Sequence, residues 1–255
     1  MRNILNSPLL VMALSLLVLW LSQRIGAFFR KRRGKLEDEE RADLGVVVAA
    51  TLTLLGLIIG FSFSMAVSRY DQRKNYEEAE ANAIGTEYVR ADLLPAADAA
   101  KVRALLRSYL DQRVLFYETR DDRQLRKIDA ATAQLETDLW SAVQAPAAAR
   151  PTPVIALAVS GMNDVLNSQG YTQAAWWNRI PGGAWVLMAA IAICCSLLIG
   201  YGTHRADAKG ILFIVLPLVV SISFFLIADI DSPRSGIIHV RAQNLARLSQ
   251  SWHSR

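Results

Sequence analysis

Acidic and basic side chains gather where one long apolar run of the sequence ends. Asp229 and Asp231 close this run, and Arg234 follows within a Pro-Arg-Ser-Gly turn. Carboxylates at the end of a membrane-spanning helix are costly to hold there unless they are paired or functional. Their oxygens would suit a hard cation, whereas a structural interpretation makes them part of an ion-pair lock. Two aspartates are too few to predict a metal centre, so both interpretations stay open.

A second polar cluster follows another apolar run and supplies partners for such a lock. Arg69 and Arg73 come directly after that run, and Glu78 and Asn82 lie four residues apart on one face of the expected helix. The lock would join an aspartate of the first cluster to Arg69 or Arg73, and Arg234 to Glu78. Asn is a poor choice for a merely solvated helix, so this face is expected to touch another helix or an ion path.

The run that precedes Arg69 carries a ridge of small residues. Its members recur every three or four positions and therefore share one face of a helix: Thr53, Gly56, Gly60, Ser64 and Ser68. Such a ridge lets helix backbones approach closely in lipid; the same hydroxyls and exposed backbone could instead line a hydrated pathway. Phe61 and Met65 lie on the alternate face and could form an apolar constriction that gates by dewetting.

Four apolar runs must position these residues. They cover residues 9–29, 45–68, 183–202 and 211–229, and each is close to the roughly 20 residues that a helix needs to cross a bilayer core. The sequence therefore predicts an all-α membrane protein. Two transmembrane helical hairpins, at 1–68 and 183–229, flank a helical extramembrane domain at 69–182, and a C-terminal segment covers 230–255. Four crossings place both polar clusters on one membrane face.

The middle domain is predicted to be wholly helical. It lacks the alternation of a strand and is rich in Ala, Leu, Arg and Glu. The second span is expected to continue as a stalk over residues 69–94. Further helices are expected at 98–117, 122–144 and 154–167, with a loop that begins at Pro146.

The composition excludes several classes of function. Residues 69–180 carry 14 Lys/Arg against 15 Asp/Glu, whereas nucleic-acid binding needs a concentrated basic face. Cys194 and Cys195 are adjacent, and the three histidines show no metal-ligand spacing. The chain has no catalytic triad pattern and no glycine-rich phosphate loop. We expect no enzyme, no metal and no cofactor.

The side of the membrane on which the domain lies is left open by the charges near the spans. The two faces carry similar numbers of Lys and Arg. The dense cluster at 30–33 favours cytoplasmic short loops, which would make the domain periplasmic. We expect a multi-pass protein of the cell membrane, with the inner membrane of a bacterium as its site.

Four stretches of the chain resemble the bacterial bestrophin-like domain family. The resemblance rests on Gly60–Ala66, Ser68–Asp71, Glu78–Thr86 and Asp229–Ile238, and it covers nearly the whole chain. It implies a four-span, oligomeric membrane protein. True bestrophins are more distant: these are pentameric ion channels whose second span lines the pore and whose acidic stretch after the fourth span helps to bind calcium. They keep their large domain in the cytoplasm. Asp229 and Asp231 occupy a similar place, but the dense run of acids is missing.

Two hypotheses of function follow. The first is an oligomeric ion channel with the second span at the pore axis, so that the partners are membrane lipid, further copies of the chain and inorganic ions. The second is a non-conducting membrane scaffold or sensor whose helical domain binds a partner.

Overall fold

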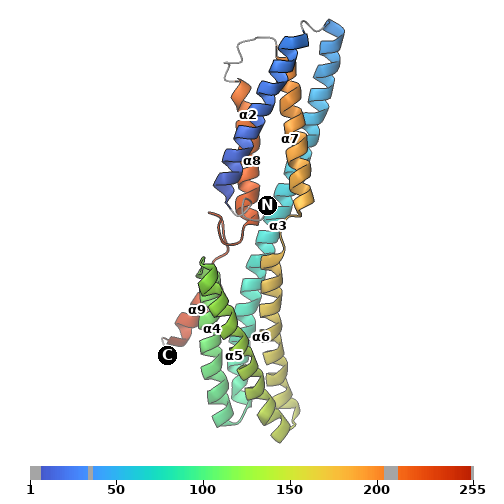
Figure 1. Ribbon diagram of the computed structural model, residues 1–255. Helices are drawn as coiled ribbons and strands as arrows, with labels where there is room; N and C mark the ends of the chain where they lie inside the picture. Colours follow the sequence, from blue (N-terminus) through green and yellow to red (C-terminus); the bar gives the residue numbers. More distant parts are fainter. Residues whose placement is uncertain (1–6, 34–36, 204–211, 254–255) are drawn as a thin grey trace. The chain divides into compact units, whose positions relative to one another are not determined.

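The computed structural model of the protein describes residues 7–33, 37–203 and 212–253, and no strand occurs among them. The helices are α2 (Pro8–Arg33), α3 (Asp38–Arg90), the short 3-10 helix η1 (Ala91–Leu93), α4 (Ala96–Glu118), α5 (Asp122–Ala149), α6 (Pro153–Trp177), α7 (Gly182–Gly202), α8 (Leu212–Asp231) and α9 (Gln243–His253) (Figure 1). The chain forms two compact units. The membrane unit comprises Met1–Arg69 and Arg179–His239, and the polar unit comprises Tyr70–Asn178 and Val240–Arg255.

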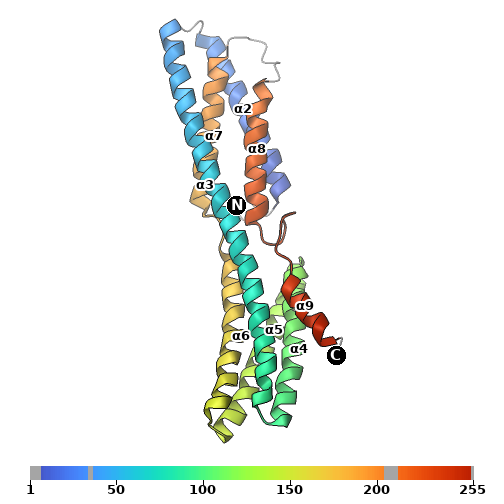
Figure 2. The same ribbon diagram turned by 180° about the vertical axis from the view of Figure 1, so that it is seen from behind.

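Four helical stretches of the described chain are long and apolar enough to cross a membrane, which confirms the predicted class of an all-α membrane protein. They contain α2, the first part of α3, α7 and α8. In the membrane unit α2 packs against both α7 and α8, and Figure 2 shows these helices side by side from behind. Ile211, the predicted start of the last span, lies outside the described residues.

The α2 and α7 helices cross with their backbones in contact. A side chain at Gly26 would overlap the Leu197 carbonyl and lie 2.9 Å from the Tyr201 backbone nitrogen. A side chain at Gly200 would likewise overlap the Gln23 carbonyl. Small residues allow helices in lipid to approach this closely, so the two glycines set the α2–α7 crossing.

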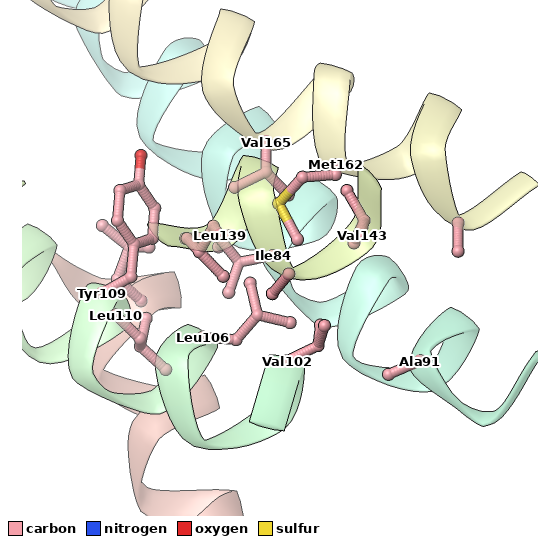
Figure 3. Close-up of a cluster of buried hydrophobic side chains, with 14 of the residues drawn as sticks. Ile84, Ala91, Val102, Leu106, Tyr109, Leu110, Leu139, Val143, Met162 and Val165 are labelled. Carbon is pink, nitrogen blue, oxygen red and sulfur yellow. The ribbon is translucent and has the colours of Figure 1, made fainter. Parts of the chain in front are cut away.

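The polar unit has a core of apolar side chains from α3, α4, α5 and α6. Ile84, Leu106, Leu139 and Met162 are all fully buried there, and Figure 3 shows them converging. The helices pack in sequence, α4 on α5 and α5 on α6, while α9 packs on α4. The unit therefore has a continuous core of its own.

Two of the expected helix ends were wrong. The helix α5 continues through Pro146 to Ala149 because a proline in the last turns removes only one backbone hydrogen bond and this ring is buried. The helix α6 continues past residue 167 to Trp177. Its buried face persists as far as Trp176, and that packing outweighs the cost of the exposed Gly170, about 1 kcal/mol relative to Ala. The helix α9 was not anticipated.

Candidate functional site

The membrane part of α3 presents its small residues outward. Outside the backbone of α3 itself, no described residue comes within 4 Å of the position that a side chain would take at Gly45, Gly56 or Gly60. Thr53, Ser64 and Ser68 are also exposed. The Thr53 hydroxyl donates to the Ala49 carbonyl of its own helix at 2.9 Å. The described part of the chain therefore does not pack on these small residues, which leaves their surface open to another molecule.

The opposite face of the same segment is buried. Leu55, Ser62 and Ala66 are at most 4% exposed, and their spacing of seven and then four residues places them on one face. Phe61 and Met65 lie outside this strip and are 64% and 38% exposed. The membrane part of α3 thus has one inward face and a broad outward face that combines small and large apolar side chains.

Asp229 closes the turn that follows α8. Its two carboxylate oxygens accept hydrogen bonds from the backbone amides of Ile237 and Ile238, at 2.7 and 2.8 Å. The carboxylate is almost fully buried. Gly236 is needed at this turn, because a side chain there would overlap the Asp229 carbonyl. Backbone donors of this kind satisfy a buried carboxylate without a cation.

Asp231 ties the end of α8 to the segment before α7. It accepts a hydrogen bond from the backbone amide of Ile180 at 3.0 Å and forms an ion pair with Arg179 at 3.1 Å. Nearby, the hydroxyls of Ser232 and Ser235 are 2.6 Å apart. Within the described parts of the chain no group of three or more His, Cys, Asp or Glu could hold a metal ion.

Two buried charged side chains of the polar unit form hydrogen bonds with backbone groups at the ends of helices. Arg73 donates to the carbonyls of Ala175 and Asn178 at the end of α6, at 3.2 and 3.3 Å. Glu77 accepts from the backbone amides of Asn244 and Leu245 at the start of α9, at 2.8 and 3.0 Å. A cation at a helix C-terminus and a carboxylate at an N-terminus each complement the helix dipole. Both contacts fix the ends of neighbouring helices onto α3.

A charged network lies inside the polar unit. Glu80 forms an ion pair with Arg113, and its Oε2 atom also accepts hydrogen bonds from the hydroxyls of Tyr117 and Thr172 at 3.2 and 3.1 Å. All four side chains are buried. Burial by itself lowers the pKa of Arg113, but the Glu80 carboxylate raises it above its ordinary value. Burial raises the pKa of Tyr117, so its hydroxyl stays a donor.

Glu87 is the exception among these buried charges. Its side chain is fully buried, and neither carboxylate oxygen has a hydrogen-bond partner among the described residues. A side chain at Gly161 would overlap the carboxylate, so the backbone of α6 packs directly onto it. Burial raises the pKa of Glu87 to about 8, against an opposing effect of Arg90 and with a smaller contribution from Asp164. Glu87 is therefore largely protonated at neutral pH.

A family model of the bestrophin-like domain matches residues 9–245 of the chain. The chain belongs to the bestrophin-like family. A structure of a bacterial bestrophin homologue from Klebsiella pneumoniae, a point mutant, shares 12% identity with a TM-score of 0.63, over 97% of this chain and 98% of that chain. Another structure of a bestrophin homologue from that organism shares 13% identity with a TM-score of 0.61, over 95% and 98% of the two chains. No curated protein matches the chain.

Membership of the bestrophin-like family confirms the resemblance inferred from the sequence, and the structure shows where the predicted site residues lie. All seven residues of the predicted ridge and constriction are exposed on α3. Asp231 forms an ion pair with Arg179, which the lock hypothesis did not include, and both aspartates accept hydrogen bonds from backbone amides. Arg69 donates to the Met65 sulfur at 3.5 Å and forms no ion pair with a described residue.

The remaining residues of the predicted polar cluster do not share one environment. Arg73 binds carbonyls of its own unit, and Glu78 and Asn82 are exposed on α3. Arg234 is half-buried beside the turn that Asp229 closes. The predicted polar stripe of Glu78 and Asn82 therefore faces away from the core of the polar unit.

Sequence reasoning missed the charged positions that pack inside the polar unit. Six buried positions there, five in α3 and one at the start of η1, recur at alternating spacings of four and three, which is the spacing of a packed helix seam: Arg73, Glu77, Glu80, Ile84, Glu87 and Ala91. Four of the six are charged, so a search for apolar periodicity passes over them. The alternating spacing of four and three residues was the signal from which these buried positions could have been predicted.

Proposed function

We propose that this bestrophin-like protein is an oligomeric ion channel of the bacterial inner membrane in which copies of α3 surround the axis. The observation that carries the proposal is the outward ridge of Gly56 and Gly60, on which none of the described residues packs. Glycine in a helix costs stability, and it brings a compensating gain where another backbone approaches. A second copy of the same helix would supply that approach.

The ridge also carries groups that suit a hydrated path. Ser64 and Ser68 place hydroxyls on the outward face, toward the end of α3's membrane segment. Phe61 and Met65 lie beside them and are exposed. A ring of such apolar side chains would gate by dewetting. Under this proposal the polar unit lies outside the membrane. Which ion passes, and on which side of the membrane the polar unit lies, are questions for experiment.

Cysteine cross-linking tests the arrangement of copies. The native Cys194 and Cys195 are first replaced by Ala, because Cys194 is exposed. Gly56→Cys in that background should form a disulfide-linked dimer in membranes under mild oxidation. The matched control is Ala13→Cys, at an exposed position of α2, and it should remain monomeric on a denaturing gel. Equal cross-linking at both positions would contradict the arrangement in which copies of α3 surround the axis.

Ion flux tests conduction. Purified protein in liposomes should dissipate a gradient of K⁺ or of Cl⁻, and Gly60→Leu should change the rate at least about tenfold, the equivalent of 1.4 kcal/mol in a barrier. Ala13→Leu adds similar bulk to an exposed face of α2 and should leave flux unchanged. No flux of any ion would contradict the channel.

The alternative is a non-conducting scaffold or sensor. It is favoured by the apolar groove between α5 and α6, where Trp140 and Ile155 line the wall, and by the exposed side chains of Val154 and Leu157 nearby. Exposed apolar side chains that cluster in this way mark interaction surfaces. Cross-linking at Gly56 without ion flux would support this alternative.

A further inference from the structure

A groove at the ends of α2 and α7 has no role in the proposed channel. Its volume is about 650 Å³, and its lining combines apolar side chains with two arginines: Gly26, Phe29, Arg32, Arg33, Leu197, Leu198 and Tyr201. All of them belong to the membrane unit. The groove thus offers both a charged rim and an apolar wall to a single ligand.

The rim of the groove carries more donors than the described residues satisfy. Arg33 is held in place, since it donates to the Tyr201 hydroxyl at 3.1 Å and forms an ion pair with Glu40 at 3.0 Å. Arg32 lies 4.6 Å from the centroid of the Phe28 ring. No described residue accepts a hydrogen bond from its guanidinium. Arg30, one residue outside the lining, has a buried Nη1 atom with no hydrogen-bond partner in the described chain. The excess of guanidinium donors favours an anion, and phosphate in particular.

The wall of the groove is apolar and extends along about two turns of α2. Phe29, Leu197 and Leu198 line it together with Gly26, where the α7 backbone lies directly against α2. Gly26 precedes Arg33 by seven residues, which is about 10 Å along a helix. That length takes a ligand from the headgroup layer into the upper acyl region. A free phosphate would use the rim and leave the wall empty.

We propose that this groove binds one anionic phospholipid. Its phosphate lies against Arg32 and Arg33, and one acyl chain lies along Phe29, Leu197 and Leu198. Basic pockets between membrane helices recognise anionic headgroups in this way. The acidic side chain at the rim, Glu40, is already paired with Arg33, so a net positive charge remains for the lipid. The proposal is independent of ion conduction.

Native mass spectrometry of the purified full chain tests the proposal. Dioleoyl phosphatidylglycerol and dioleoyl phosphatidylcholine share their acyl chains and differ in headgroup charge. We expect the wild-type chain to retain phosphatidylglycerol preferentially. Near a membrane surface each cation contributes enough that losing one lowers affinity about fivefold. Arg32→Gln combined with Arg33→Gln should therefore lower retention by about tenfold or more.

Two further variants separate a site from bulk charge. Lys31→Gln removes a neighbouring exposed cation that does not line the groove, and it should lower retention clearly less than the loss of the two groove arginines. Leu198→Trp fills the groove with both arginines intact, and it should lower retention of phosphatidylglycerol. Equal loss in Lys31→Gln, equal retention of both lipids, or no effect of Leu198→Trp would overturn the proposal. Displacement of the lipid by inorganic phosphate alone would identify a phosphate site instead.

Discussion

Glu87→Gln should remove a pH dependence from the stability of the polar unit. The wild-type carboxyl is fully buried and its pKa is about 8 in the folded state, against an ordinary value near 4.5. The folded state therefore keeps a proton that the unfolded state releases above pH 4.5. The contribution of Glu87 to the free energy of unfolding is fully present below pH 4.5. It falls as the pH rises and is constant again above pH 8.

The size of this effect follows from the shift. Each pH unit between the two pKa values costs about 1.36 kcal/mol, so the free energy of unfolding should fall by about 3 to 4 kcal/mol between pH 5 and pH 8. Gln resembles the protonated carboxyl in shape and carries no titratable proton. The variant should match the wild type at pH 5 and be more stable than it at pH 8.

Urea unfolding of the full chain in detergent measures this difference. Far-ultraviolet circular dichroism follows the loss of helix, and tryptophan fluorescence reports on the polar unit through Trp176, which is buried there. Burial also raises the pKa of Glu136, but that group is present in both proteins and cancels in the comparison. Glu78→Gln, at an exposed position of the same helix, is the control and should keep the wild-type pH profile. If wild type and Glu87→Gln lose stability in parallel from pH 5 to pH 8, the reasoning is refuted.

Two other substitutions test the buried contacts of the polar unit. Arg113→Met should lower the free energy of unfolding by about 3 to 5 kcal/mol because it leaves the Glu80 carboxylate buried without its cation, and adding Glu80→Leu should recover part of that loss in urea unfolding; a larger loss in the double variant would contradict this account. Glu77→Ala should remove the carboxylate that accepts from the amides of Asn244 and Leu245, at a local cost of about 1 to 2 kcal/mol. Hydrogen exchange at residues 243–253 should then speed up by roughly tenfold, and unchanged exchange would show that α9 is held by other contacts.

The sequence predicted the class and the apolar helices well because long apolar runs have few alternatives in lipid. The ends of α5 and α6 were harder to predict. Pro146 and Gly170 are residue types that ordinarily interrupt a helix. Here tertiary packing before and after each of them stabilises a continuous helix. Such packing depends on residues far away in the chain, which local sequence patterns do not report.

The role of the candidate site stays a prediction. The structure does place Gly56 and Gly60 on the outward face of α3. The roles of Asp229 and Asp231 were less accessible, because the backbone amides that they bind carry no side-chain signal. The burial of Glu80 was hidden for a different reason. Acidic residues on a helix are ordinarily exposed, and the burial of Glu80 depends on Arg113, Tyr117 and Thr172, which all come more than thirty residues later in the chain.

The backbone contact between α2 and α7 has a mechanical consequence. At Gly26 and Gly200 no flexible side chain separates the two helices. A slide by one turn would bring other side chains into the space that the glycines leave, and densely packed interiors resist such a change. The two helices therefore translate and tilt together as one rigid body. Any rearrangement of the membrane unit must be accommodated around this pair, through hinges or shear at other helix contacts.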